Sequence, residues 1–303
     1  MRAFVSRIHA IVCLLFHAID CLKVASINRQ IAGRTLPPVE RHHVKREELM
    51  AYPRSLVGKT VLVIGGNGAI GAATGRLFAD AGATVLVTHM PGEQGATSAD
   101  AVISSLANAE RHARYAVDIT NSSALGDLAR TIEQKFGKLD VLVNAAGFTK
   151  PIAHRDLDAL TDELIDDIFK VNWRSQFAAI RAFAPLLKKS GDGLVVSISS
   201  IAAFTGVGSN IAYCAAKAGI DVMTKALARV LAPEIRVLAI SPGVVDTQFV
   251  PGRGSDFNEK VAASTPLGRI GEVDDIAAAI LASATLLGFS TGHIIQVDGG
   301  RAL

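Results

Sequence analysis

The chain has 303 residues, of which 50% are hydrophobic and 19% are charged, with 27 glycines and 10 prolines. This composition excludes a disordered or collagen-like chain, and the length allows one large domain or two small ones. Three cysteines are too few for a disulfide framework, which favours a reducing compartment such as the cytoplasm. The net charge of +3 raises the question of a nucleic-acid or membrane partner.

The positive charge is concentrated at the beginning of the chain. Residues 1–55 hold nine basic and four acidic side chains, a net charge of +5, whereas the 248 residues that follow hold 22 basic and 24 acidic ones, a net charge of −2. We therefore predict a basic, poorly ordered extension over residues 1–55 and a single globular domain over residues 56–303. Because the domain has no basic patch, we expect no nucleic acid as a partner.

The predicted extension begins with two arginines and a short apolar run over residues 8–16. This run is shorter than the ~20 apolar residues of a membrane span, so no stable span is expected. No clear signal-peptide cleavage site follows it, although an organelle-targeting segment stays open. Met50 is an alternative start, and we expect a protein that begins there to keep its activity, which an assay of the shortened chain would check.

Seven short apolar runs in the domain are typical of buried strands. They lie at residues 59–64, 84–88, 114–117, 139–144, 193–199, 235–240 and 293–297. Helical patterns separate most of them, at residues 69–81, 121–136, 160–189, 210–231 and 272–287. The alternation predicts an α/β fold of the Rossmann type, a doubly wound parallel seven-stranded sheet between two layers of helices. Residues 241–266 form the one long irregular stretch, which a compact domain usually keeps for function.

A glycine-rich turn follows the first predicted strand and opens the first predicted helix. Three glycines in the segment GGNGAIG fit the pattern G-x-G-x-x-G. Glycines let the backbone approach a pyrophosphate, and the free N–H groups of the helix N-terminus favour its negative charge. This placement predicts a dinucleotide-binding turn made by Gly65, Asn67, Gly68, Ala69, Ile70 and Gly71.

The second predicted strand ends at Thr88-His89-Met90 without an acidic residue. An acid at this place binds the ribose 2′-hydroxyl of NAD, so its absence removes the repulsion of a 2′-phosphate. The Thr88 hydroxyl and a partly protonated His89 could favour such a phosphate. Because no Arg or Lys stands beside them, we expect NADP(H) to be only slightly preferred over NAD(H).

Tyr213 and Lys217 stand four residues apart at the start of a predicted helix, which places both side chains on one helix face. A phenol ordinarily titrates near 10, and a neighbouring ammonium lowers that value because it stabilises the phenolate. Tyr213 could then act as a general acid or base on an alcohol or carbonyl oxygen. The spacing by itself is a weak signal.

These motifs stand in the order found in the short-chain dehydrogenase/reductase family. Residues 57–303 resemble its compact single-domain branch, and among its members the 3-oxoacyl-(acyl-carrier-protein) reductases. The resemblance implies catalytic roles for Asn172, Ser200, Tyr213 and Lys217. It also implies that the cofactor is contacted by Tyr213, Lys217, Asp118, Ile119, Asn144, Ala145, Ala146, Gly147, Pro242, Gly243, Val245 and Thr247.

The turn departs from the compact branch's usual pattern T-G-x-x-x-G-x-G, since Ile64 replaces the threonine and Ala69 replaces the middle glycine. The backbone can still turn, so we expect cofactor binding to survive. The resemblance implies an NAD(P)-dependent oxidoreductase that exchanges a hydride between the nicotinamide and a carbonyl or secondary alcohol. Tyr213 would transfer the proton, while Ser200 would fix the substrate oxygen and Asn172 would anchor a water that links Lys217 to solvent.

The family resemblance does not identify the substrate. The family resemblance favours a 3-oxoacyl thioester as the substrate, and a sugar, a steroid or a small alcohol are alternatives. Residues 148–157, 201–208 and 247–266 should border an apolar pocket, where Lys150, His154 and Arg155 could guide an acidic carrier. The histidines show no metal-ligand spacing with cysteines, so we expect no metal.

The family resemblance implies a homo-oligomer, commonly a tetramer formed through the long helices predicted at residues 160–189 and 210–231. An alternative function is a nucleotide-binding regulator or scaffold of the same fold that does not turn the cofactor over. The presence of all four catalytic residue types argues against that alternative.

Overall fold

A computed structural model describes residues 53–252, 254 and 256–303, so nearly all of the predicted extension lies outside the described residues. Seven parallel strands form one sheet in the order β3-β2-β1-β4-β5-β6-β7, which confirms the predicted doubly wound sheet. The strands are β1 (Thr60–Ile64), β2 (Thr84–His89), β3 (Ala113–Ala116), β4 (Val141–Asn144), β5 (Gly193–Ile198), β6 (Ile235–Pro242) and β7 (Ile294–Val297).

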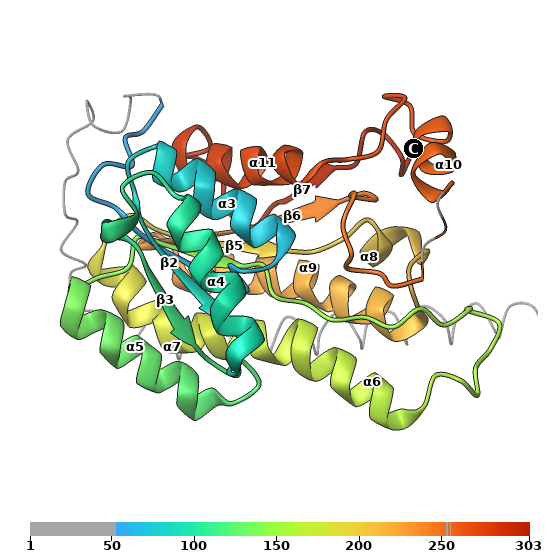
Figure 1. The fold of residues 1–303 in the computed structure, drawn as a ribbon, viewed down its shortest axis with the longest axis horizontal. Helices are drawn as coiled ribbons and strands as arrows, with labels where there is room; N and C mark the ends of the chain where they lie inside the picture. The colour runs from blue at the N-terminus through green and yellow to red at the C-terminus, as the bar shows by residue number, and fades with distance from the viewer. Residues whose placement is uncertain (1–52, 253, 255) are drawn as a thin grey trace, which may run out of the picture. The chain divides into compact units, whose positions relative to one another are not determined.

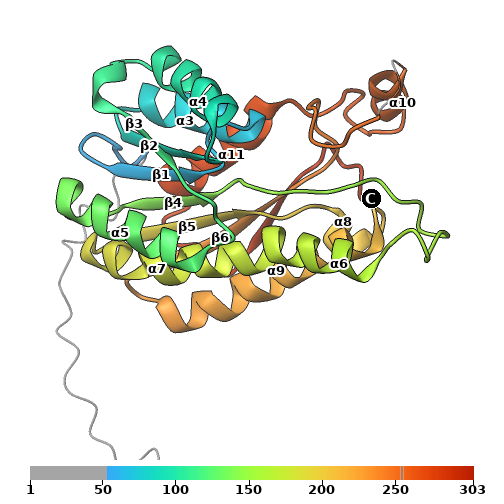
Figure 2. The same ribbon diagram turned by 60° about the horizontal axis from the view of Figure 1, so that its bottom comes forward.

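Helices cover both faces of the sheet (Figures 1 and 2). One layer holds α3 (Ala69–Asp80), α4 (Glu93–Ser105) and α11 (Val273–Thr285), and the other holds α5 (Ser122–Phe136), α7 (Ser175–Lys189) and α9 (Ile211–Leu231). The shorter elements are η1 (Ala109–Arg111), α6 (Asp162–Phe169), α8 (Ala202–Thr205) and α10 (Phe257–Ala263). No helix within residues 53–303 is long and apolar enough to cross a membrane.

Alternate residues of the strands pack into the two helical layers, because successive side chains of a strand point to opposite faces of the sheet. Leu62 and Ile64 of β1 lie in the core under α5, α7 and α9, whereas Val61 and Val63 lie in the core under α3 and α11. All five residues of β1 are buried. Burial on both faces explains why the central strands read as continuous apolar runs in the sequence.

The prediction from sequence differs from the structure in three places. Helix α4 was not predicted, because only one of its residues, Ala99, is buried and its helical apolar pattern is weak. The helix predicted over residues 160–189 consists of α6 and α7 joined by a π-helical turn, Lys170–Arg174. The stretch 241–266 is not wholly irregular, since β6 continues to Pro242 and α10 lies within it.

The strand order reverses beside β1, which pairs with β2 on one side and with β4 on the other. Sheets of this topology bind ligands in the crevice outside the carboxyl ends of the strands at such a point. The backbone N–H of Ala145 donates to the carbonyl oxygen of Ile64 at 3.0 Å. The glycine turn after β1 and the segment Asn144–Gly147 after β4 therefore lie side by side.

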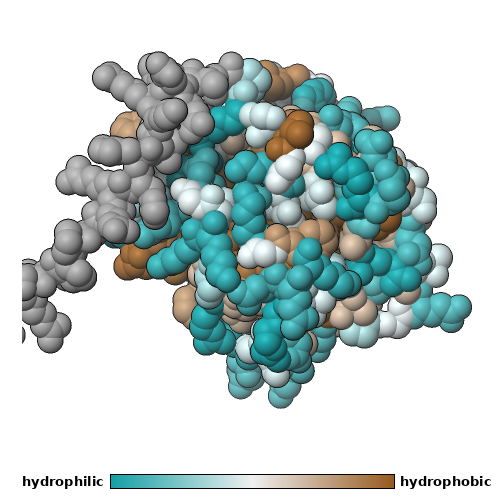
Figure 3. All heavy atoms as spheres, turned by 90° about the vertical axis from the view of Figure 1, so that its left-hand side faces the viewer, coloured by the Kyte–Doolittle hydropathy of each residue, from teal (hydrophilic) through white to brown (hydrophobic). Residues whose placement is uncertain are grey.

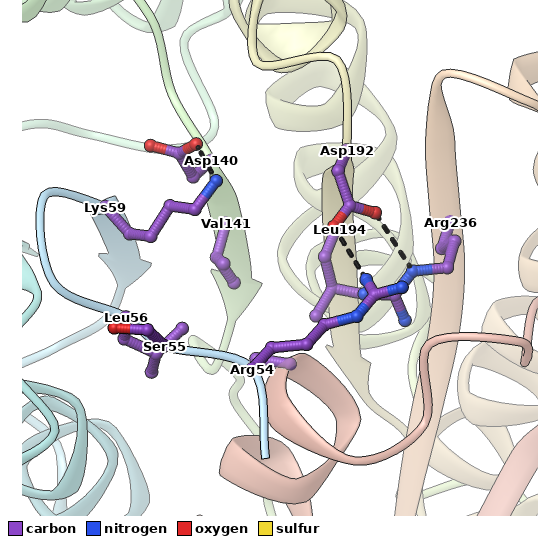
Figure 4. Close-up of a pocket in the computed structure, with 10 residues that line it drawn as sticks. Arg54, Ser55, Leu56, Lys59, Asp140, Val141, Asp192, Leu194 and Arg236 are labelled. Atoms are coloured by element: carbon purple, nitrogen blue, oxygen red, sulfur yellow. Dashed lines mark hydrogen bonds and ion pairs between the residues drawn. The ribbon is translucent and has the colours of Figure 1, made fainter. Parts of the chain in front are cut away.

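The amino-terminal ends of the strands lie on the opposite side of the sheet from this crevice. They carry several ion pairs (Figure 4). Arg54 and Arg236 contact Asp192 with N–O distances of 2.6 and 3.6 Å. The backbone N–H of Arg54 also donates to the carbonyl oxygen of Thr285 at 2.9 Å, so residue 54 is bonded to the domain. Figure 3, which views the molecule from the left-hand side of Figure 1, shows a largely hydrophilic surface.

Asp140 is a buried carboxylate at these strand ends, directly before β4. Its side chain is 2% exposed and accepts bonds from Lys59 at 3.1 Å, Lys138 at 3.0 Å, Ser190 at 2.6 Å and the N–H of Thr60 at 2.9 Å. Burial alone raises the pKa of Asp140, but these donors outweigh it and hold that pKa below its ordinary value. The carboxylate therefore stabilises the fold above its unfolded-state pKa, and this contribution is lost as the pH falls through the lower folded-state pKa.

Replacement of Asp140 by asparagine is predicted to lower the free energy of unfolding at pH 7 by about 2 kcal/mol, because it leaves two ammonium groups without their buried anion. The difference from the parent protein should shrink as the pH approaches the acid range. Urea unfolding at several pH values measures it. Asp127→Asn, on the exposed surface of α5, is the matched control and should change stability little; equal losses in both variants would contradict the account.

Candidate active site

The glycine turn packs against its neighbours too closely for side chains. Gly65 has a φ of +74°, and a Cβ atom there would lie 2.8 Å from the Cα of Ala146. A Cβ at Gly66 would lie 2.5 Å from the Cβ of Val87, and one at Gly71 only 2.3 Å from the carbonyl oxygen of Gly65. These contacts draw the first turn of α3 against the ends of β1 and β4.

The N-terminus of α3 can receive an anion. Its N-cap residue, Gly68, offers no side-chain hydrogen bond, and the first turn contains no acidic residue. Gly68 and Ala69 are exposed and Ile70 is half-buried, whereas the Asn67 side chain donates to the hydroxyl of Ser98 on α4 at 2.8 Å. The uncapped N–H groups and the helix dipole fit a pyrophosphate, as a bound dinucleotide requires.

At the end of β2, the side chains of Thr88 and His89 make contacts within the protein. The Thr88 hydroxyl accepts the N–H of Gly65 at 3.0 Å and so supports the glycine turn. His89 is 3% exposed; its Nδ1 lies 2.8 Å from the carbonyl oxygen of Met90 and its Nε2 lies 3.3 Å from Nη1 of Arg114. A guanidinium only donates, so Nε2 accepts and Nδ1 carries the proton. The His89 side chain is therefore buried and contacts Met90 and Arg114 within the protein.

Arg114 corrects the expectation that no basic side chain stands beside the end of β2. It lies on β3, 25 residues from His89 in sequence, and the strand register places it opposite Val87. Its guanidinium also holds Asp100 of α4 by two hydrogen bonds, one of them 2.8 Å long. This hydrogen-bonded pairing lowers the pKa of Asp100 and raises the pKa of Arg114.

Asp118 and Asn144 lie beyond β3 and at the end of β4. The Asp118 Oδ1 accepts from the Thr120 hydroxyl at 2.8 Å and from the Thr120 N–H at 2.9 Å, which holds the pKa of Asp118 below its usual value. Asn144 is fully buried and donates to the Ser197 hydroxyl at 3.3 Å, but its Oδ1 has no hydrogen-bond partner among the described residues. A buried acceptor without a partner can be satisfied by a ligand that binds at the carboxyl end of β4.

Asn172 is fully buried in the π-helical turn between α6 and α7. Its Nδ2 donates to the carbonyl oxygens of Phe148 at 2.7 Å and Ile168 at 2.9 Å, and its Oδ1 accepts the N–H of Phe148 at 3.2 Å. The amide therefore fastens the loop after β4 to the helix beside it. Both amide hydrogens are used within the protein, and the role in anchoring a water stays a prediction.

Tyr213 and Lys217 occupy the first two turns of α9, whose N-cap residue Asn210 accepts the N–H of Tyr213 at 2.7 Å. The Lys217 ammonium lies 5.5 Å from the centroid of the Tyr213 ring. It donates to the carbonyl oxygen of Ile198, the last residue of β5, at 2.6 Å, and the residue is only 3% exposed. This burial lowers the pKa of Lys217 to about 8.

Ser200 lies two residues after the end of β5, and its hydroxyl accepts the N–H of Ala202 at 3.2 Å, where α8 begins. The carbonyl oxygen of Pro242 accepts the N–H of Ile201 at 3.0 Å, so the end of β6 is held beside the same turn. Beyond β6, the ring of Phe249 lies 6.1 Å from the ring of Tyr213. The segment after β6 thus reaches the start of α9.

The structure brings most of the predicted site residues to the carboxyl ends of β1, β4, β5 and β6, where α3 and α9 begin. The His89 side chain, in contrast, is buried at the end of β2 and does not face the crevice as an exposed group. Two residues of the site were not predicted from the sequence. Arg114 could have been indicated only by the strand register. Asn210 has a residue type preferred at the N-cap and stands three places before Tyr213. Phe249 was predicted as a pocket residue, without any sign of its contact with Tyr213. Among the described residues, which are 53–252, 254 and 256–303, no cluster of three metal-ligating side chains is present.

Gly71→Ala is predicted to weaken dinucleotide binding at least about tenfold and to lower stability by about 1–3 kcal/mol, because the new methyl group would collide with the carbonyl oxygen of Gly65. Gly75→Ala on the same helix is the control, since its Cβ would meet Val85 at an ordinary 3.5 Å. Thermal unfolding and calorimetric titration measure both effects. Similar affinities in the two variants would show that the close turn does not shape the binding site.

Comparison with known proteins adds an independent line of evidence. A family model described as "Enoyl-(Acyl carrier protein) reductase" matches residues 65–302. The chain is 32% identical over 251 residues to the 3-oxoacyl-(acyl-carrier-protein) reductase FabG of Thermotoga maritima, covering 82% of this chain and 99% of that protein. It is 34% identical over 248 residues to cis-4-hydroxycyclohexanecarboxylate dehydrogenase of Sinomonas cyclohexanicum, covering 80% and 96%.

Solved structures give the same result. The crystal structure of a short-chain dehydrogenase/reductase from Brucella melitensis, titled glucose/ribitol dehydrogenase, superposes with a TM-score of 0.75 at 30% identity, covering 83% of this chain and 99% of that one. Sequence motifs, sheet order and these relatives agree. The chain belongs to the short-chain dehydrogenase/reductase family and is an NAD(P)-dependent oxidoreductase that acts on CH–OH and C=O groups.

Proposed function

We propose that Tyr213 is the general acid and base of this oxidoreductase. The observation that carries the proposal is the buried Lys217 ammonium, which lies beside the Tyr213 ring on one face of α9 and donates to Ile198 at the end of β5, two residues before Ser200. A positive charge enclosed by protein acts strongly on a nearby phenol, because little water screens it. This arrangement favours the phenolate at a lower pH than an ordinary tyrosine would reach.

Each of the four residues has a distinct task in the proposed mechanism. In reduction, Tyr213 gives its phenolic proton to the carbonyl oxygen, and in oxidation its phenolate takes the proton of the alcohol. The Ser200 hydroxyl donates a hydrogen bond to the same oxygen and fixes its position. Lys217 stabilises the phenolate and binds the nicotinamide ribose. Asn172 holds the loop after β4 in place and anchors a water that connects Lys217 with solvent.

The residues present fit a nicotinamide dinucleotide, which when bound supplies or accepts the hydride. The close glycine turn and the uncapped N-terminus of α3 suit its pyrophosphate, and the buried orphan oxygen of Asn144 lies at the adjoining strand end. We propose that the cofactor is bound by the turn of residues 65–71, by Asp118 and Ile119, by the segment Asn144–Gly147, and by Pro242, Gly243, Val245 and Thr247 beyond β6.

A modest preference for NADPH is predicted, with kcat/KM up to about tenfold higher than for NADH. The end of β2 has no acid to repel a 2′-phosphate, and the Arg114 guanidinium stands beside it. The preference stays modest because Asp100 already pairs with Arg114. Steady-state kinetics with both cofactors measure the ratio, and a higher kcat/KM with NADH would contradict the prediction.

We propose a 3-oxoacyl thioester as the substrate, in agreement with the name of the Thermotoga maritima relative. Partly exposed apolar side chains beside the site, Phe148, Phe204 and Phe249, suit an acyl chain. Lys150 and Arg155 are exposed on the loop after β4 and could attract an acidic carrier. The name of the Sinomonas cyclohexanicum relative makes a cyclic alcohol the second candidate. Cofactor oxidation against a panel of both compound classes distinguishes them.

A homotetramer is proposed from the outer surface of α7 and α9. On α7, the half-buried Phe177 stacks with Trp173 of the π-helical turn at a centroid distance of 6.1 Å, and the Arg181 guanidinium lies over the Phe177 ring. On α9, Val222 and Val230 are 66% and 70% exposed, and we propose that a second subunit covers them. Sedimentation of the purified protein tests the proposal, and a monomer would refute it.

A cytoplasmic location is proposed because the chain has too few cysteines for a disulfide framework and the cysteine within the described residues, Cys214, is a free thiol. Cell fractionation tests this, and recovery in an organelle or in the culture medium would refute it.

Tyr213→Phe is predicted to lower kcat by about 10²–10⁴-fold while dinucleotide affinity changes much less, because the aromatic ring remains but the hydroxyl that carries the transferable proton is lost. Tyr115→Phe removes the same group from a position where the hydroxyl has no hydrogen-bond partner among the described residues, and it should keep full activity. Turnover and dinucleotide titration of the two variants provide the comparison. Near-normal turnover of Tyr213→Phe would instead favour a nucleotide-binding regulator or scaffold.

A further inference from the structure

Asp221 follows Tyr213 and Lys217 along one side of α9. Residues spaced four apart lie on the same helix face, so the three side chains form a row that begins at the first turn of the helix. Asp221 is half-buried and has no part in the chemistry described above. A carboxyl group that is partly withdrawn from water next to a buried ammonium needs a physical explanation.

Asp221 is bonded to the end of β5 through Ser199. The Ser199 hydroxyl donates to Oδ1 of Asp221 at 2.5 Å and makes a longer contact of 3.4 Å with the carbonyl oxygen of Lys217. Ser199 is 2% exposed and stands between Ile198, whose carbonyl oxygen accepts the Lys217 ammonium, and Ser200. One carboxylate therefore fixes the short segment that carries both the acceptor of Lys217 and the candidate catalytic serine.

The charges around Asp221 come from its own helix. Lys217 and Lys225 lie near it on α9, and the Ser199 hydroxyl contacts it from the residue that follows β5. Within the described part of the chain, α6, the π turn, α8 and β6, which also pack on α9, add no charged group that shifts the pKa of Asp221 or Lys217. Burial raises the pKa of Asp221 above its ordinary value, and the Ser199 hydroxyl and both ammoniums offset only part of that rise.

The same carboxylate acts on Lys217 in the opposite sense to burial. Burial lowers the pKa of Lys217, and the Asp221 charge counteracts part of that decrease, so that the value is about 8. At neutral pH the charged form of Lys217 is therefore favoured by its neighbour one helical turn away.

We propose that Asp221 is a positioning residue for Lys217: its carboxylate, anchored by Ser199, holds Lys217 as an ammonium at the end of β5 and sets the pH at which the Tyr213–Lys217 pair gives up its first proton. The proposal rests on the roles of Tyr213 and Lys217 proposed above. Asp221 thereby becomes a third ionisable group beside Tyr213 and Lys217. Its hydrogen bond with Ser199 links the end of the sheet to α9.

The expected direction of the effect follows from charge alone. Asp221→Asn removes a negative charge that favours protonation of both Lys217 and Tyr213, so the pair should lose its first proton at lower pH. The ascending limb of kcat/KM for alcohol oxidation should move toward acid by about half a pH unit to one unit. Asparagine keeps an oxygen that can accept the Ser199 hydroxyl, so the link between β5 and α9 persists.

Two further variants separate charge from geometry. Ser199→Ala removes the hydrogen bond but keeps the carboxylate, and we expect a lower maximal rate with a much smaller shift of the pH limb. Asp166→Asn removes an equal charge from an exposed position on α6 and should leave both the rate and the pH limb unchanged. Thermal unfolding of every variant confirms that the compared proteins are folded.

Tyrosinate absorbance gives a readout that does not depend on turnover. The absorbance titration of the cofactor-free protein minus that of Tyr213→Phe isolates Tyr213, and Asp221→Asn should shift it to lower pH. The proposal is supported if Asp221→Asn moves both the kinetic limb and the absorbance titration toward acid. It is overturned if neither moves, or if Ser199→Ala or Asp166→Asn moves them equally.

The two levels of proposal fail in different ways. An active Tyr213→Phe variant would refute the proposed function and this inference with it. An inactive Tyr213→Phe variant together with an unshifted Asp221→Asn variant would refute the role of Asp221 alone.

Discussion

The ammonium of Lys217, enclosed at the point where β5 meets α9, is the constraint on which the arrangement of the site depends. A charge withdrawn from water costs several kcal/mol unless it is hydrogen-bonded and paired. The carbonyl oxygen of Ile198 provides the hydrogen bond at 2.6 Å. That oxygen is available only because β5 ends there, between β4 and β6, while α9 crosses the same edge. The sheet order therefore determines where the proton-transfer chemistry can be located.

The cofactor side of the site depends on a different constraint, which is close backbone packing. Gly65 and Gly71 let the turn after β1 approach the end of β4 and its own first helical turn at distances that no side chain permits. This leaves the N-terminus of α3 open toward the crevice beside β1. Asn172 joins the two halves, since its amide binds the loop that leaves β4 while its π-helical turn packs against α9.

Much of this could be predicted from the sequence, because the signals were local. Buried strands appear as apolar runs, the glycine turn lies directly after one of them, and Tyr213 and Lys217 are four residues apart on one helix. The features that were missed depend on contacts between distant residues. Arg114 reaches His89 through the pairing of β2 with β3, and the burial of the His89 ring depends on the same packing. Asn172 in the π-helical turn is hydrogen-bonded to Phe148, 24 residues away in the chain.

The central claim is that the buried charge of Lys217 makes Tyr213 a usable acid and base near neutral pH. The pH dependence of kcat/KM for alcohol oxidation in the parent enzyme and in Lys217→Met tests it most directly. The account predicts an ascending limb well below the ordinary phenol value of about 10 in the parent enzyme, and a shift of that limb to higher pH with a lower rate in the variant. A limb at the same pH in both proteins would contradict it.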